Sequence, residues 1–134
     1  MPISGALSDS TTGPLLAGVV YPASGSLSVA AGSTLTVQPG AIVKFVTGAA
    51  SFQVAGTLLV QGQVAQPVIF TEIQDDSAGG DTNGNGPSSG TPGYWRGLAF
   101  SDSADASVLD ACEVRFGGWG YHPGLQLTHA DLIL

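Results

Sequence analysis

Short runs of alternating apolar and polar residues recur through the first half of the chain, separated by turns rich in glycine and proline. Each run carries two apolar residues two positions apart, which is the spacing of a β-strand with one buried face. Six such pairs precede residue 73: Leu27/Val29, Leu35/Val37, Val43/Phe45, Phe52/Val54, Leu58/Val60 and Val68/Phe70. We therefore expect a series of short strands whose core consists of these residues.

The apolar pairs also repeat in groups of three. Equivalent positions are separated by 25 residues from Leu27 to Phe52, 23 from Leu35 to Leu58 and 25 from Val43 to Val68. Three strands in every 23–25 residues predict a coil whose successive turns stack, with equivalent strands paired in parallel. Leu27, Phe52 and Leu98 should then lie in neighbouring turns.

The alternation stops after Glu72. Residues 73–94 are mostly Gly, Ser, Thr, Asp and Asn, a composition typical of an exposed loop. Alternation resumes in the segments 95–100, 107–116 and 124–134. We interpret residues 73–94 as a long loop inserted at one corner of the coil.

Two separations across this loop set the expected number of turns. Val54 to Phe100 and Phe70 to Phe116 are each 46 residues, which we interpret as two coils of 23. The sequence therefore predicts a single domain over residues 1–134 with about four coils of 23–25 residues, the last of them incomplete.

The end of the chain predicts association. Leu132, Ile133 and Leu134 close a strand-like run that lacks the polar cap with which solenoids end. Either the chain is a fragment of a longer protein, or its end pairs with another chain. Because an uncovered strand edge favours pairing with a second copy, we expect a homo-oligomer or end-to-end self-association through the C-terminal coil.

Composition excludes several other classes of protein. The chain has 134 residues, of which 43% are hydrophobic and 10% charged, and this excludes a disordered acidic tail. Three basic residues cannot supply the surface of a helical bundle. The net charge of −7 argues against binding to nucleic acid or to anionic lipid. No stretch is apolar enough to insert into a membrane.

Taken together, the segments 25–45, 56–86 and WRGLAF at 95–100 resemble the right-handed parallel β-helix domains of bacterial secreted and cell-surface proteins, the pectate-lyase-like solenoid superfamily. The resemblance implies an all-β, right-handed parallel β-helix and an extracellular or cell-surface location, although the first ten residues hold no export signal. Such domains include adhesins, surface repeats and polysaccharide enzymes, so the resemblance specifies the fold better than the function.

The inserted loop contains a candidate calcium site. Residues 81–86, DTNGNG, match the first half of a calcium loop, D-x-[DN]-x-[DN]-G, but its twelfth position is Pro92 instead of Glu. Glu72 or nearby aspartates would have to complete the ligand set. The candidate ligands are Asp75, Asp76, Asp81, Asn83 and Asn85. The alternative interpretation is that these residues simply form turns.

A polysaccharide lyase or hydrolase site is a second interpretation. Its candidate residues are Arg96, Asp102, Asp105, Asp110, Glu113 and Arg115. Glu113 and Arg115 should share one strand face, where an ion pair on a solvated sheet is the simpler explanation. With so few basic residues and so short a coil we assign no catalytic residue and favour a protein that is not an enzyme.

The aromatic residues gather late in the chain. Trp95 and Phe100 should fill the core next to the loop, whereas Trp119 and Tyr121, flanked by glycines, are the candidate contacts for a glycan or a partner protein. Cys112 alternates with Val114 and should pack as a small hydrophobic residue.

We therefore expect a non-catalytic structural, adhesion or self-assembling scaffold module with a calcium-stabilised loop. The alternative is a module that binds or degrades polysaccharide.

Overall fold

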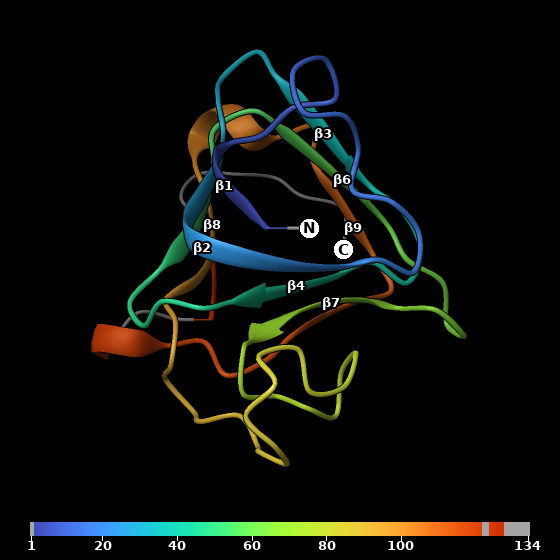
Figure 1. Cartoon of the computed structure of the whole chain (residues 1–134). Helices are drawn as coiled ribbons and strands as arrows, with labels where there is room; N and C mark the ends of the chain where they lie inside the picture. The colour runs from blue at the N-terminus through green and yellow to red at the C-terminus, as the bar shows by residue number, and fades with distance from the viewer. Residues whose placement is uncertain (1, 122–123, 128–134) are drawn as a thin grey trace.

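The protein is all-β (Figure 1), and the computed structural model describes residues 2–121 and 124–127. The strands are β1 (Ile3–Ala6), β2 (Val20–Val29), β3 (Thr34–Val37), β4 (Ile42–Phe45), β5 (Ser51–Val54), β6 (Thr57–Gln61), β7 (Val68–Glu72), β8 (Gly97–Phe100), β9 (Val108–Asp110), β10 (Cys112–Val114) and β11 (Leu125–Leu127). Two single-turn 3-10 helices are η1 (Asp102–Ala104) and η2 (Trp119–Tyr121).

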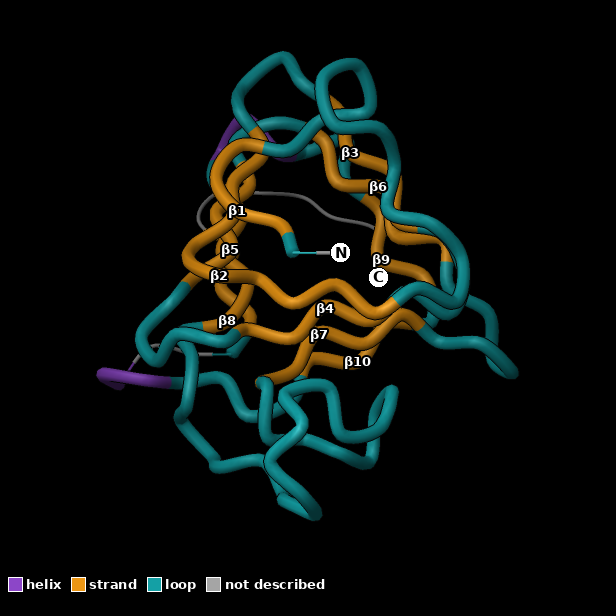
Figure 2. Tube along the Cα trace, viewed as in Figure 1, coloured by secondary structure: helices purple, strands orange, loops and turns teal. Residues whose placement is uncertain are grey.

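The strands pair in three parallel ladders (Figure 2). β2 is bent, so that its first half pairs with β4 and its second half with β5. The first ladder is β2–β4–β7–β10, the second is β1–β2–β5–β8–β11 and the third is β3–β6–β9. The backbone thus winds as a nearly closed, barrel-like spiral that is compatible with a β-helix-like fold. The prediction of an all-β protein with parallel strands is confirmed.

The core is a set of apolar columns inside this spiral. Leu27 pairs with Phe52, and Phe52 with Leu98, so these three residues lie in neighbouring turns as predicted. All twelve residues of the six predicted pairs are at most 1% exposed. Since successive side chains of a strand point to opposite faces, the period-two pattern was sufficient to identify the inward positions.

The predicted register is wrong in the first ladder. Val43 pairs with Phe70, 27 residues later, and not with Val68. The turn between β6 and β7 contains a bridge between Gln63 and Gln66 and is longer than the turn between β3 and β4. A change in turn length shifts the pairing without altering the alternation of apolar residues.

The interpretation of 46 residues as two coils is also wrong. Val54 pairs directly with Phe100, so the residues between them form one turn that includes the long loop. Phe70 pairs with Val114, and Phe116 lies beyond the end of β10. An inserted loop adds residues without adding a rung, which periodicity alone does not reveal.

The sequence pattern also failed to predict the first, partial turn of the spiral. β1 pairs with β2, and Leu15 forms a parallel bridge with Val37. Within the described residues the spiral has three complete turns, formed by β2–β3, β4–β6 and β7–β9, with a partial turn before and after them.

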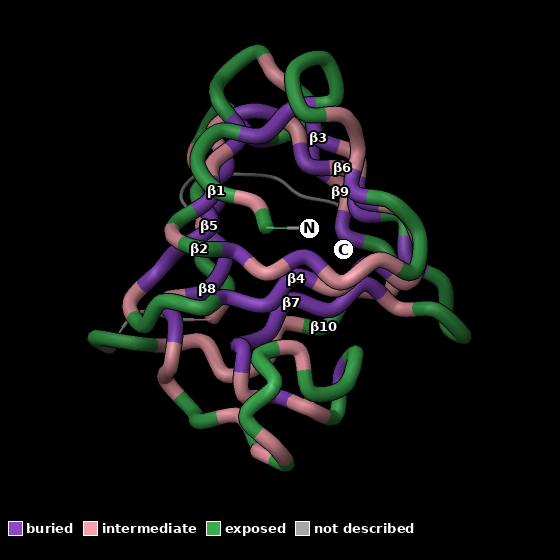
Figure 3. Tube along the Cα trace, viewed as in Figure 1, coloured by how far each residue is buried: buried purple, intermediate pink, exposed green. Residues whose placement is uncertain are grey.

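The loop between β7 and β8 folds back over the outer side of the first ladder (Figure 3). All five residues of β7 are buried, although only alternate ones face the core. Gly79 has a φ of +68°, and a Cβ there would stand 2.7 Å from Val20 Cγ2 and 3.4 Å from Ile42 Cδ1. The close approach at glycine lets the loop cover an apolar outer surface.

Candidate functional site

A column of outward-facing residues on the first ladder lies beneath the loop. Pro22 pairs with Lys44, and Lys44 with Thr71. Arg115 continues the column, because its backbone N–H donates to Phe70 O over 2.9 Å in the ladder register. Two of the three basic residues of the protein are therefore carried on the face that the acidic loop covers.

Lys44 is completely buried in this interface. The residue is 0% exposed, and its Nζ donates a hydrogen bond of 2.7 Å to the carbonyl oxygen of Gly80 in the loop. Burial lowers the pKa of Lys44, and the nearby carboxylates of Asp75, Asp76, Asp81 and Glu72 oppose that shift. The carboxylates of the loop thus favour the charged form of the Lys44 amino group, whereas burial disfavours it.

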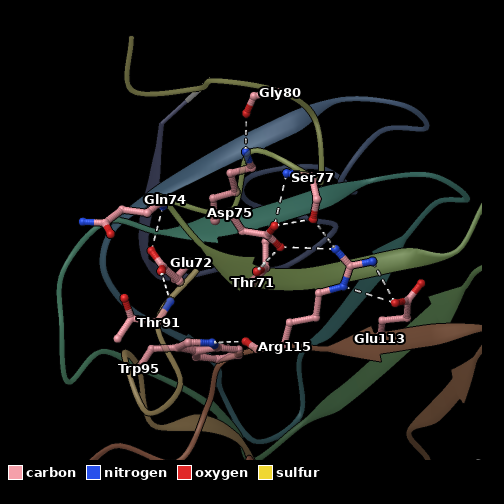
Figure 4. A network of polar contacts seen from close by, with 11 residues as sticks. Thr71, Glu72, Gln74, Asp75, Ser77, Gly80, Thr91, Trp95, Glu113 and Arg115 are labelled. Atoms are coloured by element: carbon pink, nitrogen blue, oxygen red, sulfur yellow. Dashed lines mark hydrogen bonds and ion pairs between the residues drawn. The ribbon is translucent and has the colours of Figure 1, made fainter. Parts of the chain in front are cut away.

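Asp75 is the most connected carboxylate of the loop (Figure 4). Its Oδ2 accepts hydrogen bonds from Thr71 Oγ1 at 2.7 Å and from Arg115 Nη1 at 3.2 Å, and its Oδ1 accepts from the Ser77 backbone and hydroxyl. Burial alone would raise the pKa of Asp75, but the hydrogen bonds from Ser77, Thr71 and Arg115 outweigh it and hold the pKa below its ordinary value. Asp75 is thus held ionised between the ladder and the loop.

Glu72 ties the two ends of the loop together. The residue is 0% exposed, its Oε2 accepts from the Gln74 backbone N–H and its Oε1 accepts from the Thr91 backbone N–H, both at 2.7 Å. Asp76 Oδ2 accepts from the Ser88 backbone N–H, also at 2.7 Å. The contacts of Asp76 with Ser88 and of Glu72 with Thr91 close the loop on itself across 12 and 19 residues of sequence.

The predicted calcium ligands fall into two groups. Asp75 and Asp76 lie near β7. Asp81 lies in the middle of the loop and accepts hydrogen bonds from the backbone N–H groups of Asn85 and Gly86 at 3.2 and 2.8 Å. Asn83 and Asn85 are exposed. No three His, Cys, Asp or Glu side chains of residues 2–121 and 124–127 are grouped so that they could hold one ion. Calcium binding remains a prediction.

Lys44 and Thr71 were not predicted to be parts of this site. They occupy positions that alternate with core residues and should therefore face solvent. A signal was nevertheless present, because Ile42 and Ile69 are apolar residues at outward positions of the same two strands. An apolar outer face indicates that another segment covers it.

Trp95 joins the end of the loop to the core. It is 0% exposed, its ring stacks on Phe45 with centroids 4.1 Å apart, and its Nε1 donates to Arg115 O over 2.7 Å. Phe100 is 1% exposed. The predicted core role of both aromatic residues is confirmed.

Trp119 lies at the surface. It is 42% exposed, and the guanidinium carbon of Arg96 stands 5.1 Å from its ring centroid. The Nε of Arg96 is buried and has no partner among the described residues. The side chain of Tyr121, the other predicted contact, lies outside the described part of the protein.

The candidate residues for polysaccharide cleavage lie on different parts of the spiral. Glu113 lies in β10 of the first ladder, and its Oε1 forms an ion pair with Nη2 of Arg115 at 2.9 Å. Asp110 lies on the third ladder, in a hollow of about 410 Å³ that Leu59 and Gly62 also line. Asp102 begins η1. The ion pair expected of Glu113 and Arg115 is present.

Cys112 is the free cysteine of the described residues. It pairs with Val68 in the first ladder and lines a hollow of about 360 Å³ with Leu109 and Val114. Burial and the nearby carboxylate of Glu113 raise the pKa of the thiol to about 12, so it stays protonated and packs as an apolar group.

Both ends of the spiral present apolar surface. Leu125 and Leu127 of β11 are 36% and 42% exposed, and β11 pairs with β8 alone among the described strands. At the opposite end, Leu7 and Tyr21 border a hollow of about 430 Å³. Leu132, Ile133 and Leu134, which the sequence singled out for association, lie outside the described residues.

Comparison with protein-family models, curated proteins and solved structures found no match to this sequence. Within the described residues, no helix is both long and apolar enough to span a membrane.

Proposed function

We propose that the protein is a right-handed parallel β-helix module that serves as a non-catalytic structural scaffold of a secreted or cell-surface protein, and that it assembles through the ends of its spiral. Parallel connections within one sheet are right-handed in about 98% of cases, which supports the hand of the coil. The extracellular location rests on the resemblance of the sequence to surface-protein β-helices.

The observation that carries this proposal is the edge at β11, which among residues 2–121 and 124–127 pairs with β8 alone. β11 continues the second ladder in register with β8, and its exposed leucines continue the columns of Leu98 and Phe100. A parallel ladder that ends in this way offers unpaired backbone groups and apolar side chains to another rung. The contact that best completes it is a strand from a second copy or from an adjoining module.

Sedimentation velocity over a range of protein concentrations tests the assembly. We expect concentration-dependent association that Leu127→Lys weakens, because the charge would lie in the new interface. Val64→Lys is the matched control, since Val64 is 98% exposed but lies in the turn after β6, away from either end. A monomer at every concentration, or equal effects of both substitutions, would contradict the proposal.

Calcium stabilisation of the loop is a separate part of this proposal. The acidic residues support it, as does Asp76 Oδ1, which is buried and has no hydrogen-bond partner among the described residues. The carboxylates also oppose the lowering of the Lys44 pKa by burial, so Lys44 and calcium would be attracted by the same acidic groups. We expect calcium to raise the melting temperature and Asp81→Ala to reduce that rise. Identical melting in calcium and in EDTA would refute this part without affecting the assembly.

A polysaccharide-binding or polysaccharide-degrading module is the second candidate, and exposed Trp119 beside Arg96 favours it. An exposed indole stacks on sugar rings, and a guanidinium binds carboxylate groups. Titration calorimetry and depolymerisation assays with neutral and acidic polysaccharides test this function. Trp119→Ala should abolish binding if the candidate is correct, and a scaffold without glycan affinity should show neither binding nor cleavage.

A further inference from the structure

The loop contains both asparagines of the protein, Asn83 and Asn85, and glycine follows each of them. Both asparagines are exposed. An asparagine followed by glycine is prone to deamidate, because without a Cβ on glycine its backbone nitrogen can reach Cγ of the asparagine. Both sites are exposed and followed by glycine, and they differ in the preceding residue, which is Thr82 for Asn83 and Gly84 for Asn85. We expect their local contacts to decide which of them reacts.

Those contacts differ. The backbone N–H of Gly86 donates to Asp81 Oδ2 over 2.8 Å, and the N–H of Asn85 donates to Asp81 Oδ1 over 3.2 Å. Asp81 therefore holds both peptide groups that flank Asn85. Gly84 has a φ of +69°, and its backbone N–H donates no hydrogen bond to any described residue.

The reaction needs only water. The nitrogen of Gly84 gives up its proton to hydroxide and attacks Cγ of Asn83, so that a new bond forms between these two atoms and the bond from Cγ to Nδ2 breaks. Nδ2 takes a proton from water and leaves as ammonia. Water then opens the resulting succinimide at either carbonyl and yields aspartate or isoaspartate at position 83.

The same step is opposed at Asn85. Removing the proton of Gly86 would break a hydrogen bond to a carboxylate and leave two negative groups 2.8 Å apart. The nitrogen is also held toward Asp81. We propose that Asn83 is a self-modification site of the folded protein, and that Asp81 protects Asn85 from the same reaction.

The modification adds one negative charge at position 83, in the middle of the loop, and takes the net charge from −7 to −8. The new carboxylate would lie two residues from Asp81, so the acidity of the loop would rise as the protein ages. No Asp-Gly pair occurs in the sequence, so position 83 would be the principal source of isoaspartate.

Peptide mapping by mass spectrometry tests the proposal on the intact chain of 134 residues, incubated folded at mildly alkaline pH and, in parallel, unfolded in urea. Fragment ions assign the mass change to position 83 or 85. In the folded protein we expect Asn83 to react about tenfold faster than Asn85, the factor that one hydrogen bond to a charged acceptor can account for. In urea the two rates should converge.

Asp81→Ala supplies an independent measurement in the folded state. It should accelerate reaction at Asn85 toward the rate of Asn83 and change the rate at Asn83 much less. Equal rates in the folded wild-type protein, or faster reaction at Asn85, would overturn the proposal. If Asp81→Ala does not fold, the comparison of the folded and urea-unfolded wild-type protein still decides it.

Discussion

Removing the Asp75 carboxylate should separate the loop from the ladder beneath it. In Asp75→Ala the hydroxyl of Thr71, on a residue that is 0% exposed, loses the acceptor that lies 2.7 Å away. A buried donor left without a partner costs about 1–3 kcal/mol. The ion pair with Arg115 contributes about 1 kcal/mol at most, because the Arg115 side chain is 29% exposed and screened by solvent. The expected loss of unfolding free energy is therefore about 1–4 kcal/mol.

A double-mutant cycle with Thr71→Val isolates the buried part of this effect. Replacing both partners by apolar groups removes the unsatisfied hydroxyl, so the double variant should be more stable than the sum of the single effects predicts by about 1–2 kcal/mol. Urea unfolding followed by circular dichroism measures each free energy. Hydrogen exchange of residues 73–94 should show that Asp75→Ala exposes the loop amides before global unfolding.

Asp102→Ala is the matched control, because Asp102 is an exposed aspartate of η1, away from the loop. We expect it to leave both the unfolding free energy and the exchange of the loop unchanged. Additive effects of Asp75→Ala and Thr71→Val, or a loss for Asp75→Ala below about 0.5 kcal/mol, would refute the view that this carboxylate anchors the loop.

Three further predictions concern the same framework. The pKa of Asp75 is lower in the folded state than in the unfolded state, so the carboxylate contributes fully to stability above the unfolded pKa and this contribution is lost as the pH falls. The urea midpoint of the wild type should therefore drop more steeply below about pH 4 than that of Asp75→Asn. Gly56→Ala should cost about 2–3 kcal/mol by thermal unfolding, because the added Cβ would lie 2.2 and 2.3 Å from two backbone oxygens, whereas Gly25→Ala meets nothing within 4 Å and should cost far less. Trp95→Ala should cost about 3–5 kcal/mol in the same assay, since a fully buried ring is removed, while Trp119→Phe should have little effect.

The core residues of the strands could be predicted from the sequence, because the alternation of apolar and polar residues shows which side of a strand is buried. Leu27, Phe52 and Leu98 stack as the pattern required. Register could not be predicted equally well, because it depends on turn length, and turns carry no periodic signal. The bridge between Gln63 and Gln66 is sufficient to move the partner of Val43.

The site could be predicted only in part. The sequence pointed to the acidic residues of the loop, but nothing near them in the sequence indicates that Lys44, 36 residues before Gly80, donates a hydrogen bond to the loop. Such a contact depends on how a segment without regular structure folds back in three dimensions. The outward Ile42 and Ile69 were the accessible clue that this face is covered.

The anchoring of the loop has a consequence for how the molecule folds and opens. Its contacts come from Lys44 in β4, Thr71 in β7 and Arg115 after β10, which belong to three successive turns. Solenoids ordinarily gain and lose their repeats one neighbour at a time. Here the loop can dock only after all three turns have stacked, and fraying of the last turn withdraws Arg115 from it. The insertion therefore links the stability of turns that would otherwise open independently, so that this part of the spiral melts as one unit.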